Sequence, residues 1–254
     1  MNARENLLEE LLEIAKTASL AGASVLSERA DEPLEITVKG EAGNLVTNID
    51  LAAEQVVREL ITDRRPQDAI TGEELDDYVN SLAEVRWSID PLDGTTNYTR
   101  GAPYFCTSVA ALHVPTNHWL VGAVTAPALG RTYFASRGGG AWLTTSQGLR
   151  RLDGPLAGRS ARLLGLGFSY SQDVRVTQYA EIPQLMASFS DVRSLGSAAL
   201  GLCEVADGRL DAFVESDLFE FDWAAGALIA EESGVVVQRP TGMRGGVATF
   251  PFAT

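Results

Sequence analysis

The hydrophobic pattern of this 254-residue chain changes once, at Asp153-Gly154-Pro155. Before that point, residues 105–145 carry several β-rich runs broken by Gly and Pro, which predict an antiparallel sheet. After it, apolar runs of strand length alternate with helical ones, which predicts an α/β arrangement. We therefore expect an α+β half over residues 1–152 and an α/β half over residues 153–254, packed as one compact unit.

The spacing of apolar residues places the expected elements. In the first half we expect helices over residues 7–26 and 51–60, a short strand over 36–39 and a strand from Val85 that stops at Asp90-Pro91. Pro91 cannot donate to a sheet ladder, so the chain is expected to leave the sheet there. In the second half we expect strands over 163–168, 210–214 and 235–238, and helices over 177–188, 197–206 and 222–232.

Composition and charge limit the classes of function. The chain has 34 acidic and 20 basic residues, a formal net charge of −14, which repels nucleic acid and anionic membranes. An acidic protein that acts on phosphates needs a local positive charge, and a bound divalent cation is the natural source. The sequence shows no signal peptide and no membrane-spanning run, and Cys106 and Cys203 are expected to be buried free thiols, so we expect a cytoplasmic protein.

The segment from Trp87 to Asn97 is the clearest candidate for chemistry. It places Asp90 at the end of a strand and Asp93 three residues later across a turn. The Leu92 carbonyl between them can be freed from strand pairing. Two carboxylates and a carbonyl are hard oxygen ligands, which suit Mg²⁺ rather than zinc or copper. By itself, however, the pattern is equally typical of an ordinary Asp-Gly turn.

The residues that follow can contact an anion. Gly94 lets the backbone approach a ligand closely. If Thr95-Thr96-Asn97 opens a helical turn, its amides point toward whatever the cations hold.

Three further acids lie at the ends of predicted elements. Glu73 belongs to the turn Gly72-Glu73-Glu74, directly after the apolar pair Ala69-Ile70. Asp50 and Asp222 each precede a helix and are expected to be N-caps, the usual role of such residues. Each acid alone is ordinary. His113 and His118 lack the context of a catalytic triad, so core or surface roles are expected for them.

Together, these segments resemble the inositol monophosphatase family. The resemblance covers about residues 7–237 and rests on several unrelated motifs in the family's order. They are Asn44-Leu45-Val46-Thr47 before Asp50, Gly72-Glu73-Glu74, Trp87 to Asn97, Arg193 to Ala199, and Asp222-Trp223-Ala224-Ala225-Gly226. The resemblance implies a layered αβαβα sugar-phosphatase-type fold.

The resemblance also implies roles for individual residues. Glu73, Asp90, Asp93, Asp222 and the Leu92 carbonyl would bind two or three Mg²⁺ ions. Asp50 and Thr95 would orient and activate the attacking water, with Glu73 also counted among the catalytic residues. The residues expected to contact the substrate are Gly94, Thr95 and Thr96 on the phosphate side, Gly196, Ser197, Ala198 and Glu215 on the alcohol side, and Lys39 near the phosphate.

The implied activity is Mg²⁺-dependent, lithium-sensitive hydrolysis of a small phosphorylated polyol by a homodimer, with myo-inositol monophosphate as the favoured substrate. Histidinol phosphate is the alternative substrate, and a non-catalytic cation-binding module that kept the fold is the alternative from another class. Fructose bisphosphate and adenosine bisphosphate are disfavoured because they would require additional basic residues. Leu75 departs from the family pattern, which commonly has a small hydroxyl residue there, and the family usually has a further helix beyond the last strand.

Overall fold

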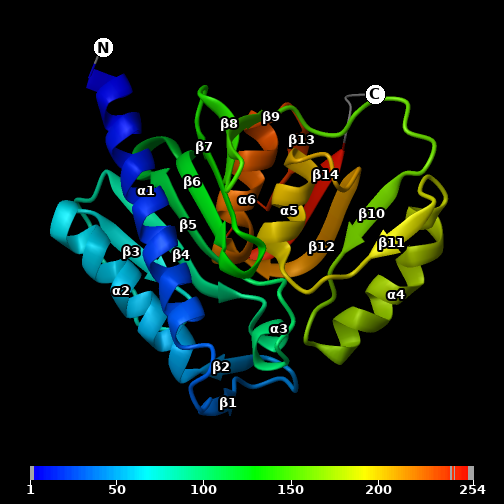
Figure 1. The fold of residues 1–254 in the computed structure, drawn as a ribbon, viewed down its shortest axis with the longest axis horizontal. Coiled ribbons are helices and arrows are strands. Elements are labelled where there is room, and N and C mark those ends of the chain that lie inside the picture. The colour runs from blue at the N-terminus through cyan, green and yellow to red at the C-terminus, as the bar shows by residue number, and fades with distance from the viewer. Residues whose placement is uncertain (1–2, 241, 243, 251–254) are drawn as a thin grey trace.

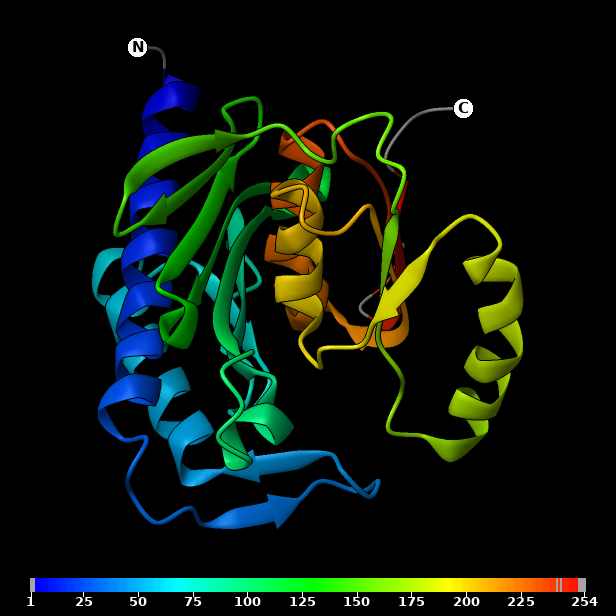
Figure 2. The same ribbon diagram turned by 45° about the vertical axis from the view of Figure 1, so that its right-hand side comes forward.

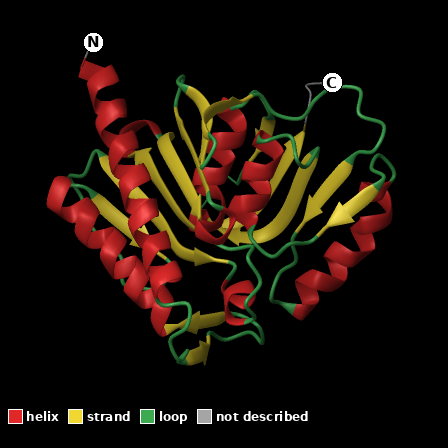
Figure 3. Ribbon diagram, in the orientation of Figure 1, coloured by secondary structure: helices red, strands yellow, loops and turns green. Residues whose placement is uncertain are grey.

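The computed structural model describes residues 3–240, 242 and 244–250. The elements form five layers, which Figures 1 and 3 show from left to right. Helices α1 (Ala3–Glu28) and α2 (Asn48–Arg64) cover one face of a seven-stranded sheet. Helices α5 (Ala198–Ala206) and α6 (Glu220–Glu232) lie between this sheet and a five-stranded one, and α4 (Gln172–Met186) covers the outer face of the latter. The expected αβαβα layering is confirmed.

The seven-stranded sheet contains consecutive strands in the order β3-β4-β5-β6-β7-β8-β9. Only β3 and β4 are parallel, and the remaining neighbours are antiparallel, as expected from the sequence. The strands are β3 (Ala69–Gly72), β4 (Val85–Asp93), β5 (Cys106–His113), β6 (His118–Ala126), β7 (Arg131–Ser136), β8 (Gly140–Thr145) and β9 (Gly148–Leu152).

The five-stranded sheet has the order β11-β10-β12-β14-β13. Strand β10 is parallel to β11 and β12, whereas β14 is antiparallel to β12 and β13. These strands are β10 (Leu163–Leu166), β11 (Asp191–Arg193), β12 (Ala212–Phe219), β13 (Val236–Gln238) and β14 (Arg244–Phe250). A separate two-stranded sheet of β1 (Ile36–Val38) and β2 (Leu45–Thr47) lies beside the short helix α3 (Thr95–Thr99), as Figure 2 shows.

The middle layer is apolar on all sides because it packs against both sheets. In α6 every residue from Trp223 to Ala230 is buried. Close approach requires glycine at two points: a Cβ on Gly122 of β6 would lie 2.9 Å from the Cα of Ala225, and a Cβ on Gly226 would lie 2.9 Å from the carbonyl oxygen of Ala199 in α5. The start of α6, where Asp222 lies, is therefore fixed by packing on both sides.

Three local predictions were wrong. Strand β4 does not stop at Asp90-Pro91 but continues to Asp93, with a shift of register between Asp90 and Asp93. Asp50 is not the N-cap of α2, because Thr47 holds that position and Asp50 is the third residue of the helix. Asp222 is likewise the third residue of α6, which starts at Glu220.

Other expectations held. Cys106 and Cys203 are free and buried. Within the described ranges, no helix is long and apolar enough to cross a membrane.

Candidate active site

The register shift in β4 exposes the Leu92 carbonyl to contacts outside the ladder. Asp90 pairs with Ser108 and Asp93 with Cys106, so two residues of β4 lie opposite Thr107 alone. The Thr107 hydroxyl donates to the Pro91 carbonyl at 2.8 Å, and the Leu92 amide donates to Asp90 Oδ1 at 3.0 Å. Such a bulge re-aims the groups it contains. Asp90, Leu92 and Asp93 are thereby held in one turn.

Helix α3 begins directly after this bulge, as expected from the sequence. Its N-cap, Gly94, has a φ of 98°, in the left-handed region that glycine tolerates best. A Cβ there would lie 2.9 Å from the Tyr104 carbonyl oxygen. The Asn97 side chain donates to the carbonyls of Tyr104 and Leu195 at 2.7 Å each. This amide fixes α3 against the segment that leads into α5.

The Asp93 side chain joins strand β4 to the start of helix α5. Its Oδ2 accepts hydrogen bonds from the Ser197 hydroxyl at 2.6 Å and from the Ala199 amide at 2.7 Å. Ser197 is the N-cap of α5 and also accepts a hydrogen bond from the Leu200 amide. The side chain of Ser197, expected from the sequence to face substrate, is therefore bonded to a carboxylate.

Glu73 and Glu74 lie on the turn after β3, and Lys39 pairs with both. Its ammonium nitrogen is 3.3 Å from Glu73 Oε1 and 2.5 Å from Glu74 Oε1. On α6, Asp222 Oδ2 accepts the Phe219 amide at 2.6 Å.

The four acids Glu73, Asp90, Asp93 and Asp222 influence one another electrostatically. Burial, followed by the negative charges of Glu73, Asp93 and Asp222, raises the pKa of Asp90 well above its ordinary value. Burial, followed by the charges of Glu73 and Asp93, does the same to the pKa of Asp222. Like charges raise one another's pKa only when they are within electrostatic range. Acids that are far apart in the sequence, from residue 73 to residue 222, therefore lie within that range of one another.

Two of these acids have smaller shifts because protein groups oppose the burial. Burial raises the pKa of Glu73 to about 8, although the Lys39 charge favours the ionised form. Burial raises the pKa of Asp93 to about 6, although the Ser197 hydroxyl and the Ala199 amide favour the carboxylate.

The oxygens of these four carboxylates are used unequally. In Glu73, Asp90 and Asp222, one oxygen accepts the hydrogen bond or ion pair described above: Glu73 Oε1, Asp90 Oδ1 and Asp222 Oδ2. Among the described residues, no donor hydrogen-bonds the second oxygen of these three acids. Asp93 is bonded more fully, because the amides of both Ala198 and Ala199 and the Ser197 hydroxyl favour its carboxylate. Hydrogen bonds that orient carboxylates and leave a free oxygen suit cation binding.

The donor set therefore fits Mg²⁺ chemically, because it consists of carboxylates and one carbonyl. The distances between these side chains are larger than in a metal site with all its ligands in place. No three or more His, Cys, Asp or Glu side chains in the described part of the chain are grouped closely enough to hold a metal ion as they stand. Repulsion between the buried charges is a physical reason for this spread.

Asp50 differs from Glu73, Asp90 and Asp222 because both of its carboxylate oxygens are bonded within the protein. Oδ2 accepts from the Thr47 amide at 2.9 Å and from the Thr47 hydroxyl at 2.5 Å, while Oδ1 accepts from the Thr95 hydroxyl at 3.1 Å. Thr47 and Asp50 form a capping box at the start of α2. The single Thr95 proton is shared, because its oxygen also lies 3.0 Å from the Leu92 carbonyl. Burial raises the pKa of Asp50, and the Thr47 hydrogen bonds oppose that rise.

The remaining expected substrate residues lie on several different segments. A Cβ on Gly167 would collide with the Glu215 carboxylate, and burial, followed by the Asp93 charge, raises the pKa of Glu215 to about 8. Thr96 is exposed, and its hydroxyl lies 3.4 Å from the Gly43 carbonyl oxygen. Gly196 has a φ of 78°, and Ala198 is buried at the start of α5.

The comparison with known proteins decides the family. The sequence matches the description "Inositol monophosphatase family" over residues 7–252. This chain belongs to the inositol monophosphatase family.

Two relatives illustrate the breadth of names within the family. The "Inositol-1-monophosphatase" of Mycobacterium leprae is 39% identical over 81% of this chain and 72% of its own length. The "Nus factor SuhB" of Salmonella typhimurium is 35% identical over 92% of this chain and 87% of its own length. These similarities identify the chain as a hydrolase of the phosphatase type.

Solved structures support the same fold. "Mycobacterium tuberculosis SuhB" matches with a TM-score of 0.79 and 34% identity, covering 99% of this chain and 93% of that one. The extragenic suppressor protein suhB of Bartonella henselae matches with a TM-score of 0.83 and 28% identity, covering 96% and 94%. An "IMPase/NADP phosphatase complexed with Mg2+ and phosphate" matches with a TM-score of 0.79 at 18% identity, which supports the fold alone.

The sequence did not reveal that Glu54 and Arg58 hold the turn that carries Glu73 in this inositol monophosphatase family member. Glu54, on α2 and with no exposed surface, pairs with Arg58 at 2.7 Å and accepts the amides of Glu74 at 2.7 Å and Leu75 at 3.3 Å. Arg58 donates to the Leu75 carbonyl at 2.9 Å. An acid and an arginine four residues apart on a helix were visible in the sequence, but their contact with a turn twenty residues later was not.

Tyr170 was also missed. It follows β10, and its ring is the closest group to a Cβ placed on Gly43, at 3.4 Å. Burial raises the pKa of the Tyr170 hydroxyl to about 12, a hydrogen bond with Thr96 opposes the rise, and the charges of Asp93, Glu73 and Asp222 add to it. A tyrosine of the C-terminal half thus lies near the acids, between the segments that carry Thr96 and Gly43.

Proposed function

We propose that this protein hydrolyses a small phosphate monoester, with myo-inositol monophosphate as the favoured substrate, in a Mg²⁺-dependent reaction. The observation that carries the proposal is the difference in hydrogen bonding among the acids of this region. In the described part of the chain, Glu73, Asp90 and Asp222 each have one oxygen without a protein donor. Asp50, in contrast, has both oxygens bonded, to Thr47 and Thr95. A uniform set of structural acids would not divide in this way.

The cations would be held by Glu73, Asp90, Asp93, Asp222 and the Leu92 carbonyl. When bound, Mg²⁺ lowers the pKa of a coordinated water and neutralises charge on a phosphate. Without such cations, four mutually repelling carboxylates would exclude a phosphate rather than bind it.

The chain's own groups account for the handling of the attacking water. Thr95 donates its only hydroxyl proton to Asp50 or Leu92, so the lone pairs of its oxygen remain available to a water. Asp50 is fixed by two bonds from Thr47 and cannot turn away. The pair would therefore orient a water and accept its proton, which is general base catalysis.

Other residues would orient the substrate. The amides of Gly94 and Thr95, at the start of α3, are the proposed phosphate contacts. Lys39, which pairs with Glu73 and Glu74 on the turn after β3, is the proposed cation on the phosphate side. The Glu215 carboxylate beside Gly167, together with Gly196, would face the hydroxyl groups of a polyol. A carboxylate accepts hydrogen bonds from several hydroxyls at once, which favours a polyol over an aromatic or purely apolar alcohol.

A panel of phosphomonoesters compared by kcat/KM, with and without Mg²⁺, tests the proposal. We expect release of phosphate only with Mg²⁺ and the highest kcat/KM for myo-inositol monophosphate. A preference for histidinol phosphate would replace the substrate assignment and keep the chemistry. Binding of Mg²⁺ without turnover of any ester would identify a non-catalytic cation-binding module and refute the enzymatic proposal.

A further inference from the structure

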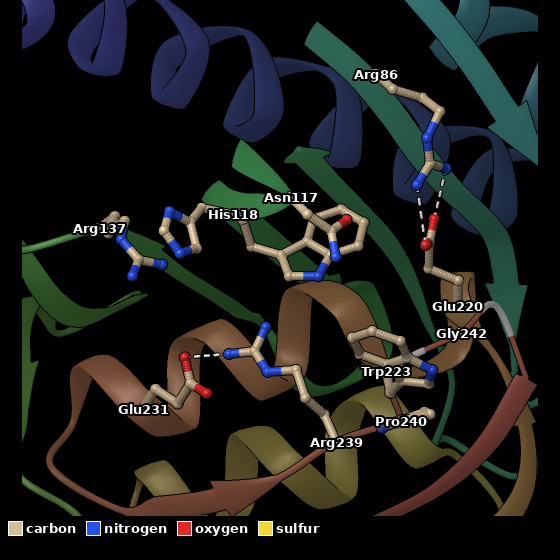
Figure 4. Close-up of a pocket in the computed structure, with 11 residues that line it drawn as sticks. Arg86, Asn117, His118, Arg137, Glu220, Trp223, Glu231, Arg239, Pro240 and Gly242 are labelled. Atoms are coloured by element: carbon tan, nitrogen blue, oxygen red, sulfur yellow. Dashed lines mark hydrogen bonds and ion pairs between the residues drawn. The ribbon is translucent and has the colours of Figure 1, made fainter. Parts of the chain in front are cut away.

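A second cavity lies along α6, and its lining includes none of the expected metal ligands. It has a volume of about 370 Å³ and is lined by residues of β4, β6, α6 and the segments that follow β7 and β13. Figure 4 shows it as an opening surrounded mainly by polar side chains, with three arginines on its walls. In a chain with a net charge of −14, a concentration of arginines is unusual.

Two of the arginines are already paired with acids in the same cavity. Arg86 forms a bidentate pair with Glu220, with nitrogen–oxygen distances of 2.5 and 2.9 Å. Arg239 pairs with Glu231, and Figure 4 shows its guanidinium reaching into the opening. These two pairs are neutral in sum, so they form the walls of the cavity without giving it a net charge.

Arg137 has no such partner. Within the described part of the chain, no acid forms an ion pair with Arg137 and no acceptor hydrogen-bonds its guanidinium. The backbone that carries Arg137 is held in place, because the carboxylate of Glu232 accepts the amides of Gly138 and Gly140 at 2.9 and 3.0 Å and so ties the turn between β7 and β8 to α6. His118 lies beside Arg137 on the same side of the opening. The cavity therefore has one uncompensated positive charge and an adjacent imidazole.

Trp223 supplies a reporter group for this cavity. Its ring lines the cavity and is 2% exposed, and its indole N–H has no hydrogen-bond partner among the described residues. Its NMR signal is therefore not dominated by a bond to the protein. The other tryptophans with recorded indole bonds, Trp87 and Trp142, donate to Asp68 and to the Gly139 carbonyl.

We propose that this cavity binds a small oxyanion, a phosphate or carboxylate group of a free metabolite, at a site separate from the metal centre. Arg137 would form the charged contact, since a guanidinium matches the planar or tetrahedral oxygens of these groups. His118 and the exposed amide of Asn117 supply further donors. The Trp119 and Trp223 rings, which meet edge to face at 5.9 Å, form the apolar wall against which the rest of the ligand packs.

The test uses the whole chain after its cations are removed with EDTA and the EDTA, itself a carboxylate anion, is removed by dialysis, so that no cation can hold an anion at the metal centre. Inorganic phosphate and citrate are titrated separately, and the four indole N–H signals are followed by ¹H–¹⁵N NMR with Trp223→Phe for assignment. We expect the Trp223 signal to shift saturably with one or both anions while the Trp87 signal stays fixed. The anion that gives the tighter saturation identifies the phosphate or carboxylate source.

Arg137→Ala is expected to weaken this binding at least tenfold. Arg151→Ala is the matched control, because it also removes one arginine charge, here from an exposed ion pair between Arg151 of β9 and Asp153. This variant should change the dissociation constant less than twofold. A circular dichroism spectrum checks that Arg137→Ala is folded, and Arg137→Gln serves if it is not. The proposal is overturned if neither anion shifts the Trp223 signal, or if both arginine variants bind as the unmodified protein does.

Discussion

The carboxylate of Glu54 accepts the main-chain amide of Glu74 at 2.7 Å, which joins helix α2 to the turn that carries Glu73. The same carboxylate pairs with Arg58. A buried acid of α2 thereby sets where an expected metal ligand lies, although it is not itself an expected ligand.

Glu54→Ala is expected to destabilise the protein and to weaken cation binding together. It leaves Arg58 buried without its acid, and breaking a buried pair costs about 3–5 kcal/mol. We expect a lower melting temperature and a higher Mg²⁺ concentration for half-maximal activity. Glu59→Ala on the exposed face of the same helix is the control, because within the described residues the Glu59 side chain accepts a hydrogen bond from Gln55 alone. An unchanged Mg²⁺ requirement in Glu54→Ala would contradict the positioning role.

Asp93→Asn should abolish turnover while the fold is retained. The asparagine oxygen can still accept from Ser197 and Ala199, but the other carboxylate oxygen is replaced by an amide nitrogen that cannot bind a cation. Losing an expected ligand should lower kcat/KM by roughly two orders of magnitude or more, beyond the 10- to 100-fold typical of outer-shell changes. In EDTA the variant should melt at the same or a higher temperature, because one repelling charge is removed. Near-normal activity would refute the ligand assignment.

Thr95→Val should reduce kcat without a comparable change in KM. The valine side chain has nearly the same volume but cannot donate to Asp50 or contact a water through oxygen. General base catalysis contributes about 10²- to 10⁴-fold, so a loss within that range is expected. Thr95→Ser, which keeps the hydroxyl, should retain most of the activity. Equal activity of the serine and valine variants would remove Thr95 from the proposed water-handling pair.

The stability of the cation-free protein should fall as pH rises. Burial raises the pKa of Glu215 from 4.5 to about 8. The folded state therefore binds this proton more tightly than the unfolded state does, so the free energy of unfolding decreases between about pH 4.5 and pH 8. Glu215→Gln removes that titration, and its melting temperature in EDTA should decline less steeply across this window. Parallel curves for the two proteins would contradict the shift.

Local sequence patterns were sufficient for the elements that fold on local information. The apolar run from Trp223 to Leu228 predicts an apolar helix, which the structure contains as α6. The sequence also allowed a helical turn at Thr95-Thr96-Asn97, and α3 begins there. Strand β14 was missed because its pairing with β12 and β13 is decided by distant residues, and its two glycines lower its strand propensity.

The error at Asp50 has a different cause. Thr47 and Asp50 are both good capping residues, three positions apart, and the Thr-x-x-Asp spacing resembles a capping box. Considering Asp50 alone hid that arrangement. The partners of Glu54 and Tyr170 could not be inferred, because each contacts a loop whose path depends on the complete fold.

Asp50 has a structural role in the capping box of α2 in addition to its proposed role in orienting the water. A descendant that stopped hydrolysing phosphate would be free to replace Glu73 or Asp90, yet losing Asp50 would still fray the start of α2. The presence of this aspartate in a relative is consequently poor evidence that the relative is an enzyme, whereas the proposed cation ligands Glu73 and Asp90, which have no such structural role in a cap, are better markers under the proposed mechanism.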